Sequence, residues 1–425
     1  MQRVDLIIHN AGQLVTCASG GRPKRGADML DVGIIENGAI AVTEGKIVGV
    51  GLSADILRDF SSDDGFDAGG RVVCPGFVDP HTHIVFAGDR LNEFELKIKG
   101  ADYLEILENG GGIISTVKHT REATLEQLVV QSLERLNKML ACGTTTAEVK
   151  TGYGLDVETE LKMLQAIAEL DSSHLVDLVP TFLGAHAVPI EYRENTEAYV
   201  DMICGEMLPK AWDWYVTTNF QAKKTPFFAD VFCEKNAFDL DQSERILRTA
   251  KALWFGLKAH VDEFTNLGGS RLAIEMGACS IDHLDAISDE EIALLAASET
   301  IGIVTPTVNF NFGSSDFANA RKLIDSGCAI ALSTDYNPGS APCPSQPMAM
   351  AIACRYQKLL PSEAMNAATI NAAYAIGLGD LVGSIEVGKQ ADLLLLDTED
   401  YRQCAYEFGG NVVQWVIKCG VLMNR

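Results

Sequence analysis

The stretch GLKAHVDEFTNLGGSRLAIEMGACSIDH, residues 256–283, contains two short β-rich runs separated by a longer segment. The runs cover residues 256–261 and 279–283, and a histidine lies at the end of each, His260 and His283. Short strands that alternate with longer helical segments are typical of parallel α/β folds. The stretch therefore predicts one repeat of such a fold, with a polar side chain where each strand ends.

Six more β-rich runs continue this alternation along the chain. They lie at residues 72–78, 144–149, 175–183, 229–233, 301–305 and 329–334. Amphipathic segments separate them, and in LEQLVVQSLERLNKMLACG, residues 125–143, apolar residues recur at helical spacing before Gly143. Eight β/α repeats predict a closed (β/α)8 TIM-like barrel, although a doubly wound open sheet shares the alternation.

The two ends of the chain differ from the middle. Both ends contain strand-like runs with turn signals. They are DLIIHNAGQLVTC and GAIAVTEGKIVGVG near the start, and VGSIEVGKQADLLLLD and VVQWVIKCGVLM near the end. One small β-sandwich domain built from both termini explains them more simply than two tiny domains. We expect residues 1–70 and 376–425 to form this domain and residues 71–375 to form the barrel.

Composition and charge limit the class of protein. The chain has 425 residues, 47% of them hydrophobic and 22% charged, as in ordinary globular proteins. Its formal net charge is −24, whereas proteins that bind nucleic acids usually carry a basic surface, so a nucleic-acid partner is not expected. Eleven scattered cysteines form no CxxC pair, and no apolar run reaches membrane-spanning length. We expect a cytoplasmic protein with reduced thiols and no contact with a membrane.

Five of the eight histidines, and one aspartate, lie at the ends of predicted barrel strands. These residues are His81 and His83 after the first strand, His186 after the third, His260 and His283 at the fifth and sixth, and Asp335 at the eighth. The carboxyl ends of barrel strands meet at one mouth, where active sites lie. The remaining histidines, His9, His119 and His174, lie outside this pattern and are interpreted as ordinary residues.

The residue types at the mouth favour a metal centre. His81 and His83 occupy alternate positions, so both side chains point the same way and can hold one ion. Neutral imidazoles with one carboxylate suit a divalent transition metal such as zinc or iron. Such an ion brings the pKa of a bound water to about 7, which makes hydrolysis at neutral pH the expected chemistry.

Longer motifs carry a resemblance to a known family. PGFVDPHTH, the histidines of strands five and six, STDYNPG and GSIEVGKQADLLLLD resemble the amidohydrolase superfamily over essentially the whole chain. Four further segments are similar to one family of this superfamily, the imidazolonepropionases. They are HTHIVFAGDRLNEFELKIKGADYLEILENGGGIISTV, EVKTGYGLDVETELKML, TFLGAHAVP and TDYNPGS. The resemblance implies hydrolysis of the cyclic amide of 4-imidazolone-5-propanoate to N-formimino-L-glutamate, in histidine degradation. It also implies one divalent metal ion per chain and a homodimer.

The resemblance assigns roles position by position. It implies His81, His83, His260 and Asp335 as metal ligands. It implies that Arg90 binds the propionate carboxylate, for which a guanidinium fork is suited. The other substrate-contact positions are Tyr153, His186, Glu263, Asn337, Gly339 and Ser340. The catalytic candidates are Glu263 or His283 as general base and Asp335 as proton relay; stabilisation of the developing oxyanion falls to the metal or His186.

Several alternatives remain open at this stage. Another amidohydrolase, such as a heterocycle deaminase, shares the metal residues, and an inactive barrel that only binds a small molecule is a different class. A binuclear member usually supplies a carbamylated lysine at the end of strand four, whereas Glu234 and Lys235 stand there. Only one of Asp262 and Glu263 is expected to face the pocket. The glycines at 110–112 are interpreted as a loop over the barrel mouth, and the role of the predicted loop 307–320 is undetermined.

Overall fold

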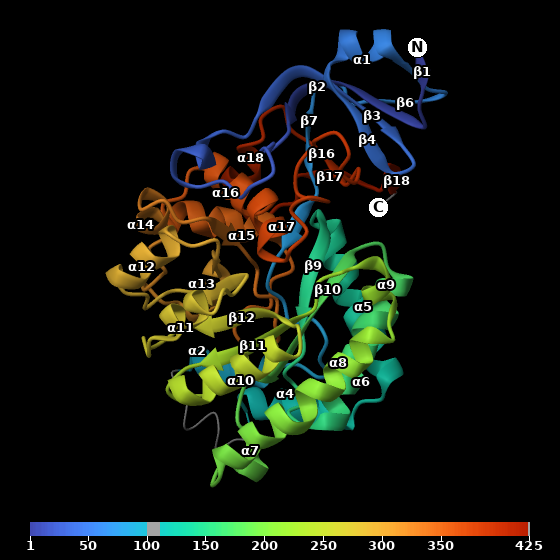
Figure 1. Ribbon diagram of the computed structural model, residues 1–425. Coiled ribbons are helices and arrows are strands. Elements are labelled where there is room, and N and C mark those ends of the chain that lie inside the picture. The colour runs from blue at the N-terminus through green and yellow to red at the C-terminus, as the bar shows by residue number, and fades with distance from the viewer. Residues whose placement is uncertain (100–110, 424–425) are drawn as a thin grey trace.

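The computed structural model describes residues 1–99 and 111–423 of the chain (Figure 1). Eight parallel strands form the central sheet in sequence order. They are β8 (Phe77–Asp79), β9 (Thr144–Lys150), β10 (Asp177–Ala185), β11 (Phe228–Cys233), β12 (Gly256–Val261), β13 (Ser280–His283), β14 (Ile301–Val304) and β15 (Ile330–Leu332). The predicted α/β fold class with a TIM-like barrel is confirmed.

The first and last strands of this sheet meet just beyond their ends. Thr82 and Tyr336 form a parallel bridge, and the backbone N–H of His83 donates to the carbonyl of Tyr336 at 2.9 Å. The buried Asp79 carboxylate accepts from the Ser333 hydroxyl at 2.6 Å and from the backbone N–H of Thr334 at 3.2 Å. These contacts join β8 to β15 and nearly close the barrel, so the residues after both strands share one mouth.

The helices of this part of the chain lie mostly around the outer face of the barrel (Figure 1). They are α2 (Leu91–Ile98), α4 (Ile113–Glu122), α5 (Leu125–Ala141), α6 (Val157–Ser173), α7 (Thr196–Met202), α8 (Leu208–Val216), α9 (Asn219–Lys223), α10 (Leu240–Ala252), α11 (Gly269–Glu275), α12 (Asp289–Ala296), α13 (Pro306–Phe312), α14 (Ala320–Asp325), α15 (Gln346–Ile352), α16 (Pro361–Ala367), α17 (Ile370–Ala375) and α18 (Gln403–Tyr406). Several of these helices begin with a capping box. At the start of α5, for example, the side chains of Thr124 and Gln127 each accept a hydrogen bond from the other residue's backbone N–H.

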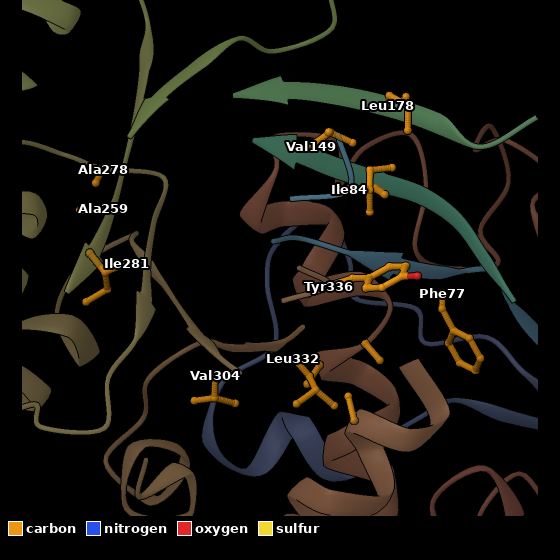
Figure 2. Close-up of a cluster of buried hydrophobic side chains, with 14 of the residues drawn as sticks. Phe77, Ile84, Val149, Leu178, Ala259, Ala278, Ile281, Val304, Leu332 and Tyr336 are labelled. Atoms are coloured by element: carbon orange, nitrogen blue, oxygen red, sulfur yellow. The ribbon is translucent and has the colours of Figure 1, made fainter. Parts of the chain in front are cut away.

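The barrel strands alternate between an apolar outer face and a polar inner face. Figure 2 shows outward residues of the large core cluster, among them Val149, Leu178, Ile281, Val304 and Leu332. On β9 the alternate residues Glu148 and Lys150 are fully buried inside the barrel. Further towards the strand starts, apolar side chains such as Val179 and Ile303 pack against α17, which closes that end. The barrel interior is therefore apolar at one end and increasingly charged towards the mouth.

A second sheet is built from both ends of the chain, which lie together in Figure 1. Its strands are β2 (Leu6–Val15), β3 (Ile34–Thr43), β4 (Lys46–Leu52), β6 (Asp64–Asp67), β7 (Val72–Pro75), β16 (Leu393–Leu396), β17 (Val413–Lys418) and β18 (Val421–Met423). A short parallel pair, β1 (Gln2–Arg3) and β5 (Phe60–Ser61), and the helix α1 (Ser53–Asp59) accompany them. Antiparallel pairing of β7 with β16 joins the two ends, as the sequence predicts.

The predicted first barrel strand, residues 72–78, is wrong as a single element. Residues 72–75 form β7 of the small domain, and the barrel begins only at Phe77. The break falls at Pro75 and Gly76, where the N–H of Gly76 donates to the carbonyl of Asp392 at 2.9 Å. A Cβ on Gly76 would lie 2.2 Å from the Thr145 hydroxyl, so the close approach needs glycine. The domain divisions at residues 70 and 375 stay predictions.

Candidate metal centre and active site

The polar residues at the strand ends converge at the barrel mouth. His81 and His83 follow β8, His186 follows β10, His260 and His283 lie on β12 and β13, and Asp335 follows β15. All of them except the partly exposed His186 are buried. The barrel brings together residues that are more than 250 positions apart because its strands run parallel and end at the same rim.

Three donor atoms of this set are spaced like the ligands of one ion. His81 Nε2 and His83 Nε2 lie 3.2 Å apart, and each lies 3.5 Å from Asp335 Oδ1. A tetrahedral site with bonds of 2.0–2.1 Å has ligand-to-ligand distances of about 3.3 Å. The His260 ring packs 4.5 Å from that of His81, and His81, His83 and His260 form a buried donor group. The geometry fits a single small cation.

The electrostatics of the set also fit a cation. Among the described residues, His260 Nε2 and Asp335 Oδ1 are buried without a hydrogen-bond partner. Burial lowers the pKa of His81, His83 and His260 well below its usual value, which keeps these rings neutral. Burial raises the pKa of Asp335 to about 8. Neutral ring nitrogens and an unsatisfied carboxylate are costly to bury alone and are stabilised by a bound divalent ion.

Two aspartates that the sequence did not point to lie against histidines of the donor set. His81 Nδ1 donates to Asp282 Oδ2 at 2.7 Å, and His260 Nδ1 lies 3.0 Å from Asp230 Oδ2. A carboxylate on one ring nitrogen leaves the other nitrogen free as a ligand. The available signal was an aspartate inside each of two short buried strands, Asp230 in ADVFC and Asp282 in CSIDH.

Of the two adjacent carboxylates, Glu263 faces the pocket and Asp262 points away from it. Glu263 Oε2 lies 3.9 Å from His283 Nε2, whereas Asp262 Oδ2 accepts from the Ser270 hydroxyl at 2.5 Å. Burial and the nearby Asp335 raise the pKa of Glu263 well above its usual range. Burial lowers the pKa of His283 to about 4. The pair places two candidate proton acceptors beside the metal-donor set.

The backbone at three of these positions adopts a sparsely populated conformation. The φ angles are 55° at Asp262, 84° at His283 and 47° at Asp335. Positive φ is uncommon outside glycine, and such strain gathers at functional sites. Here the strained residues lie at or just after the ends of β12, β13 and β15, where the chain passes from the barrel strands to the mouth.

Tyr153 and His186 form one wall of the pocket. The His186 ring stacks 5.0 Å from that of His83, and Tyr153 lies 5.8 Å from His83 and 5.3 Å from His186. His186 Nδ1 lies 3.0 Å from the carbonyl of Gly152, which only accepts, so Nδ1 carries the proton. Burial lowers the pKa of His186 to about 4, and neutral His186 therefore presents an acceptor at Nε2. This favours a contact with a substrate N–H over the expected stabilisation of an oxyanion.

Arg90 lies on the same side of the mouth, in a largely buried position. Its Nε donates to the Thr116 hydroxyl at 3.1 Å, and Nη1 lies 3.3 Å from Glu93 Oε1. A Cβ on Gly339 would lie 2.3 Å from Arg90 Nη1, so the guanidinium packs directly on the turn that follows Asp335. Arg90 is thus fixed beside the pocket by two elements, which suits the recognition of an anionic group.

The predicted contact residues Asn337, Gly339 and Ser340 form a tight turn. Asn337 Oδ1 accepts from the backbone N–H groups of Gly339 at 2.9 Å and Ser340 at 2.8 Å, and its Nδ2 donates to the carbonyl of Asp335 at 2.8 Å. The Asn337 amide is therefore used within the turn and shapes the rim next to the metal donors.

Three other predicted features have different outcomes. Of the glycines at 110–112, Gly110 lies outside the described residues, and the N–H of Gly112 donates to Glu93 Oε2 at 2.8 Å. The predicted loop 307–320 is wrong at its start, because Pro306 opens the helix α13. Glu234 at the fourth strand accepts from the N–H groups of Phe264 and Thr265, both at 3.0 Å, which turns it away from a second ion.

Sequence comparison places the chain in a known family. The chain is 53% identical over 420 residues to an imidazolonepropionase from Chloroflexus aggregans, with 99% of this chain and 98% of that relative covered. An imidazolonepropionase from Herpetosiphon aurantiacus is 52% identical over 427 residues, covering 100% and 98%. The chain belongs to the imidazolonepropionase family. The model of the wider amidohydrolase family matches residues 255–423, and the predicted family is confirmed.

Solved structures share the architecture of this amidohydrolase. An adenosine deaminase from Xanthomonas campestris with bound zinc superposes with a TM-score of 0.70 at 20% identity, covering 99% of this chain and 93% of that one. A 5-methylcytosine deaminase from Klebsiella pneumoniae gives a TM-score of 0.71 at 17% identity, covering 99% and 97%. At these identities the likeness shows the fold, a barrel with a small β domain, and does not choose between reactions.

Proposed function

We propose that this chain is a metal-dependent hydrolase that opens 4-imidazolone-5-propanoate to N-formimino-L-glutamate. The observation that carries the proposal is the buried set of His81, His83, His260 and Asp335 with Arg90 fixed at the same mouth. The near full-length relatives named imidazolonepropionase support it. A heterocycle deaminase is not favoured, since relatives at 44–53% identity carry the imidazolonepropionase name.

The four donor residues hold one divalent ion, zinc or iron. When bound, the ion supplies Lewis-acid chemistry, because it acidifies water to a pKa of about 7 and polarises a carbonyl. Asp282 and Asp230 keep the ring nitrogens of His81 and His260 aimed at it. The donor set does not itself distinguish zinc from iron, since imidazole and carboxylate suit both.

The remaining residues divide binding from proton transfer. Arg90 binds the propionate carboxylate, and Tyr153 and His186 line the face where the ring lies. Glu263 accepts a proton at Oε2 from the attacking water, with His283 at 3.9 Å as its partner. As the oxygen adds to the ring carbonyl carbon and the amide C–N bond breaks, the proton taken from the water is relayed through Asp335 to the leaving nitrogen. Holding the propionate places the carbonyl close to the ion.

Hydrolysis of freshly prepared 4-imidazolone-5-propanoate tests this function. We expect purified, metal-loaded protein to consume the compound, followed by loss of its ultraviolet absorbance, with N-formimino-L-glutamate as the product. A panel of amino-substituted heterocycles serves as the control, and release of ammonia from it is expected to stay at background. Ammonia release without ring opening would instead identify a deaminase.

Loss of the Arg90 guanidinium is expected to weaken substrate binding. Hydrogen bonds to a charged group contribute about 1.5–3 kcal/mol, so Arg90→Ala should raise KM about 10- to 100-fold with a smaller change in kcat. Steady-state kinetics measure this, with Arg271→Ala as the control because Arg271 forms an exposed ion pair with Glu290. An unchanged KM for Arg90→Ala would remove Arg90 from the binding site.

Location and assembly complete the proposal. Among the described helices none is long and apolar enough to cross a bilayer. All eleven cysteines lie in the described part of the chain as free thiols, which supports a reducing, cytoplasmic setting. The formal net charge of −24 supports the absence of a nucleic-acid partner. The family resemblance supports a homodimer, which the molar mass in solution tests.

A further inference from the structure

A cluster of buried charges lies next to the metal-donor histidines, inside the barrel. Its side chains come from the strands β9, β11, β12 and β13 and are 0% exposed; they are Glu148, Lys150, Asp230, Lys258 and Asp282. Buried charges are costly unless they are closely paired, and apolar residues would fill the same space at lower cost. The cluster therefore has a role beyond packing.

Lys150 is the centre of this cluster. Its Nζ lies 2.7 Å from Asp230 Oδ2, 3.3 Å from Asp282 Oδ2 and 3.1 Å from Glu148 Oε1. Lys258 pairs with the other oxygen of Glu148 at 2.8 Å and donates to the carbonyl of Pro80 at 3.0 Å. Lys150 is thus the ammonium that holds both aspartates.

Each of these aspartates also contacts a histidine of the metal-donor set. Asp282 accepts from His81 Nδ1 at 2.7 Å, and Asp230 lies 3.0 Å from His260 Nδ1. Two chains of contacts therefore run from one ammonium, through a carboxylate, to a metal-binding ring. Fixing the carboxylates fixes both histidines, because Asp282 is hydrogen-bonded to His81 Nδ1 and Asp230 accepts from the backbone N–H of His260 at 3.2 Å beside its ring contact.

The two aspartates and His260 also form a second group of possible metal ligands, whose atoms are close enough together to hold one ion. One ligand atom each from Asp230, His260 and Asp282 lie within 4.8 Å of one another. Lys150 Nζ lies against both carboxylates of this group. We propose that Lys150 is a built-in cation that fills this second donor group, limits the centre to one metal ion and, through the two aspartates, positions His81 and His260. The inference rests on the metal centre of the proposed function.

The charge balance of the cluster supports this role. Three carboxylates and two ammonium groups leave a formal charge of −1. Without Lys150 the charge is −2, on oxygens that face one another in a dry interior, and this matches a divalent cation. An ammonium in this position excludes a second metal ion by occupying its ligands and by repulsion.

The test is the metal stoichiometry of Lys150→Met, whose side chain has a similar length and no charge. Chelator-stripped protein is titrated with Zn²⁺ alone by calorimetry, and bound zinc is measured by mass spectrometry after dialysis. We expect one zinc per chain in the unaltered protein and two in Lys150→Met. The control Lys258→Met removes an ammonium of the same cluster that pairs with Glu148, and is expected to stay at one.

Each result has a distinct meaning. A folded Lys150→Met protein that binds one zinc overturns the inference, as do two zinc ions in the unaltered chain. If circular dichroism shows Lys150→Met unfolded, Asp282→Asn carries the test, with an expected 10- to 100-fold weaker zinc affinity; unchanged affinity overturns the inference. No zinc on the unaltered chain would contradict the proposed function itself.

Discussion

Replacing Glu263 with glutamine is expected to lower kcat about 10²- to 10⁴-fold, the range that a general base contributes. Glu263 is the carboxylate that faces the pocket, 3.9 Å from His283 Nε2, and its high pKa from burial suits a group that takes up a proton. An amide of the same shape cannot accept that proton. Steady-state kinetics measure the loss, while KM and zinc content are expected to stay close to those of the unaltered protein.

Asp262→Asn is the matched control for this variant. Asp262 precedes Glu263 and bonds to Ser270 instead of facing the pocket. Its φ of 55° is tolerated by asparagine, so the backbone is expected to remain in place. A kcat for Glu263→Gln within a few-fold of that for Asp262→Asn would show that the base is another group, and His283 would then be the candidate.

Replacing Asp335 with asparagine is expected to lower kcat/KM by about 10³-fold or more, because this residue serves two purposes. It supplies the one anionic donor, 3.5 Å from the Nε2 atoms of His81 and His83, and it passes the proton to the leaving nitrogen. Asparagine adopts the observed φ of 47° readily, so folding is expected to be preserved. Kinetics at saturating zinc and the zinc affinity are measured together.

The two purposes of Asp335 separate in these measurements. If Asp335→Asn binds zinc more weakly and excess zinc restores its activity, Asp335 acts only as a metal ligand. Unaltered zinc binding with activity lost would leave only the proton role. Unaltered activity and zinc binding would contradict both, and an unchanged melting temperature shows that the comparison is between folded proteins.

Much of the site could be predicted from the sequence because the barrel supplies its geometry. Parallel strands end at one rim, so the polar residues His81, His260 and Asp335 at the strand ends are expected to meet there. The same reasoning placed one carboxylate of Asp262 and Glu263 in the pocket. The residue types then limited the chemistry to a divalent metal with an open position.

The parts that could not be predicted depend on contacts between distant strands. Lys150, Asp230 and Asp282 lie on three different strands, and their side chains meet only when the barrel curves. The division of residues 72–78 between two sheets arises from pairing with β16, more than 300 residues away. The tautomer of His186 follows from its distance to the carbonyl of Gly152, which no local pattern records.

The measurement that tests the central claim most directly is ring opening of 4-imidazolone-5-propanoate as chelator-stripped protein is titrated with zinc or iron. We predict no turnover without metal, a rise in rate that is linear in added metal, and a plateau at one ion per chain. Full turnover by the metal-free protein, or metal-loaded protein that leaves the compound intact, would contradict the account.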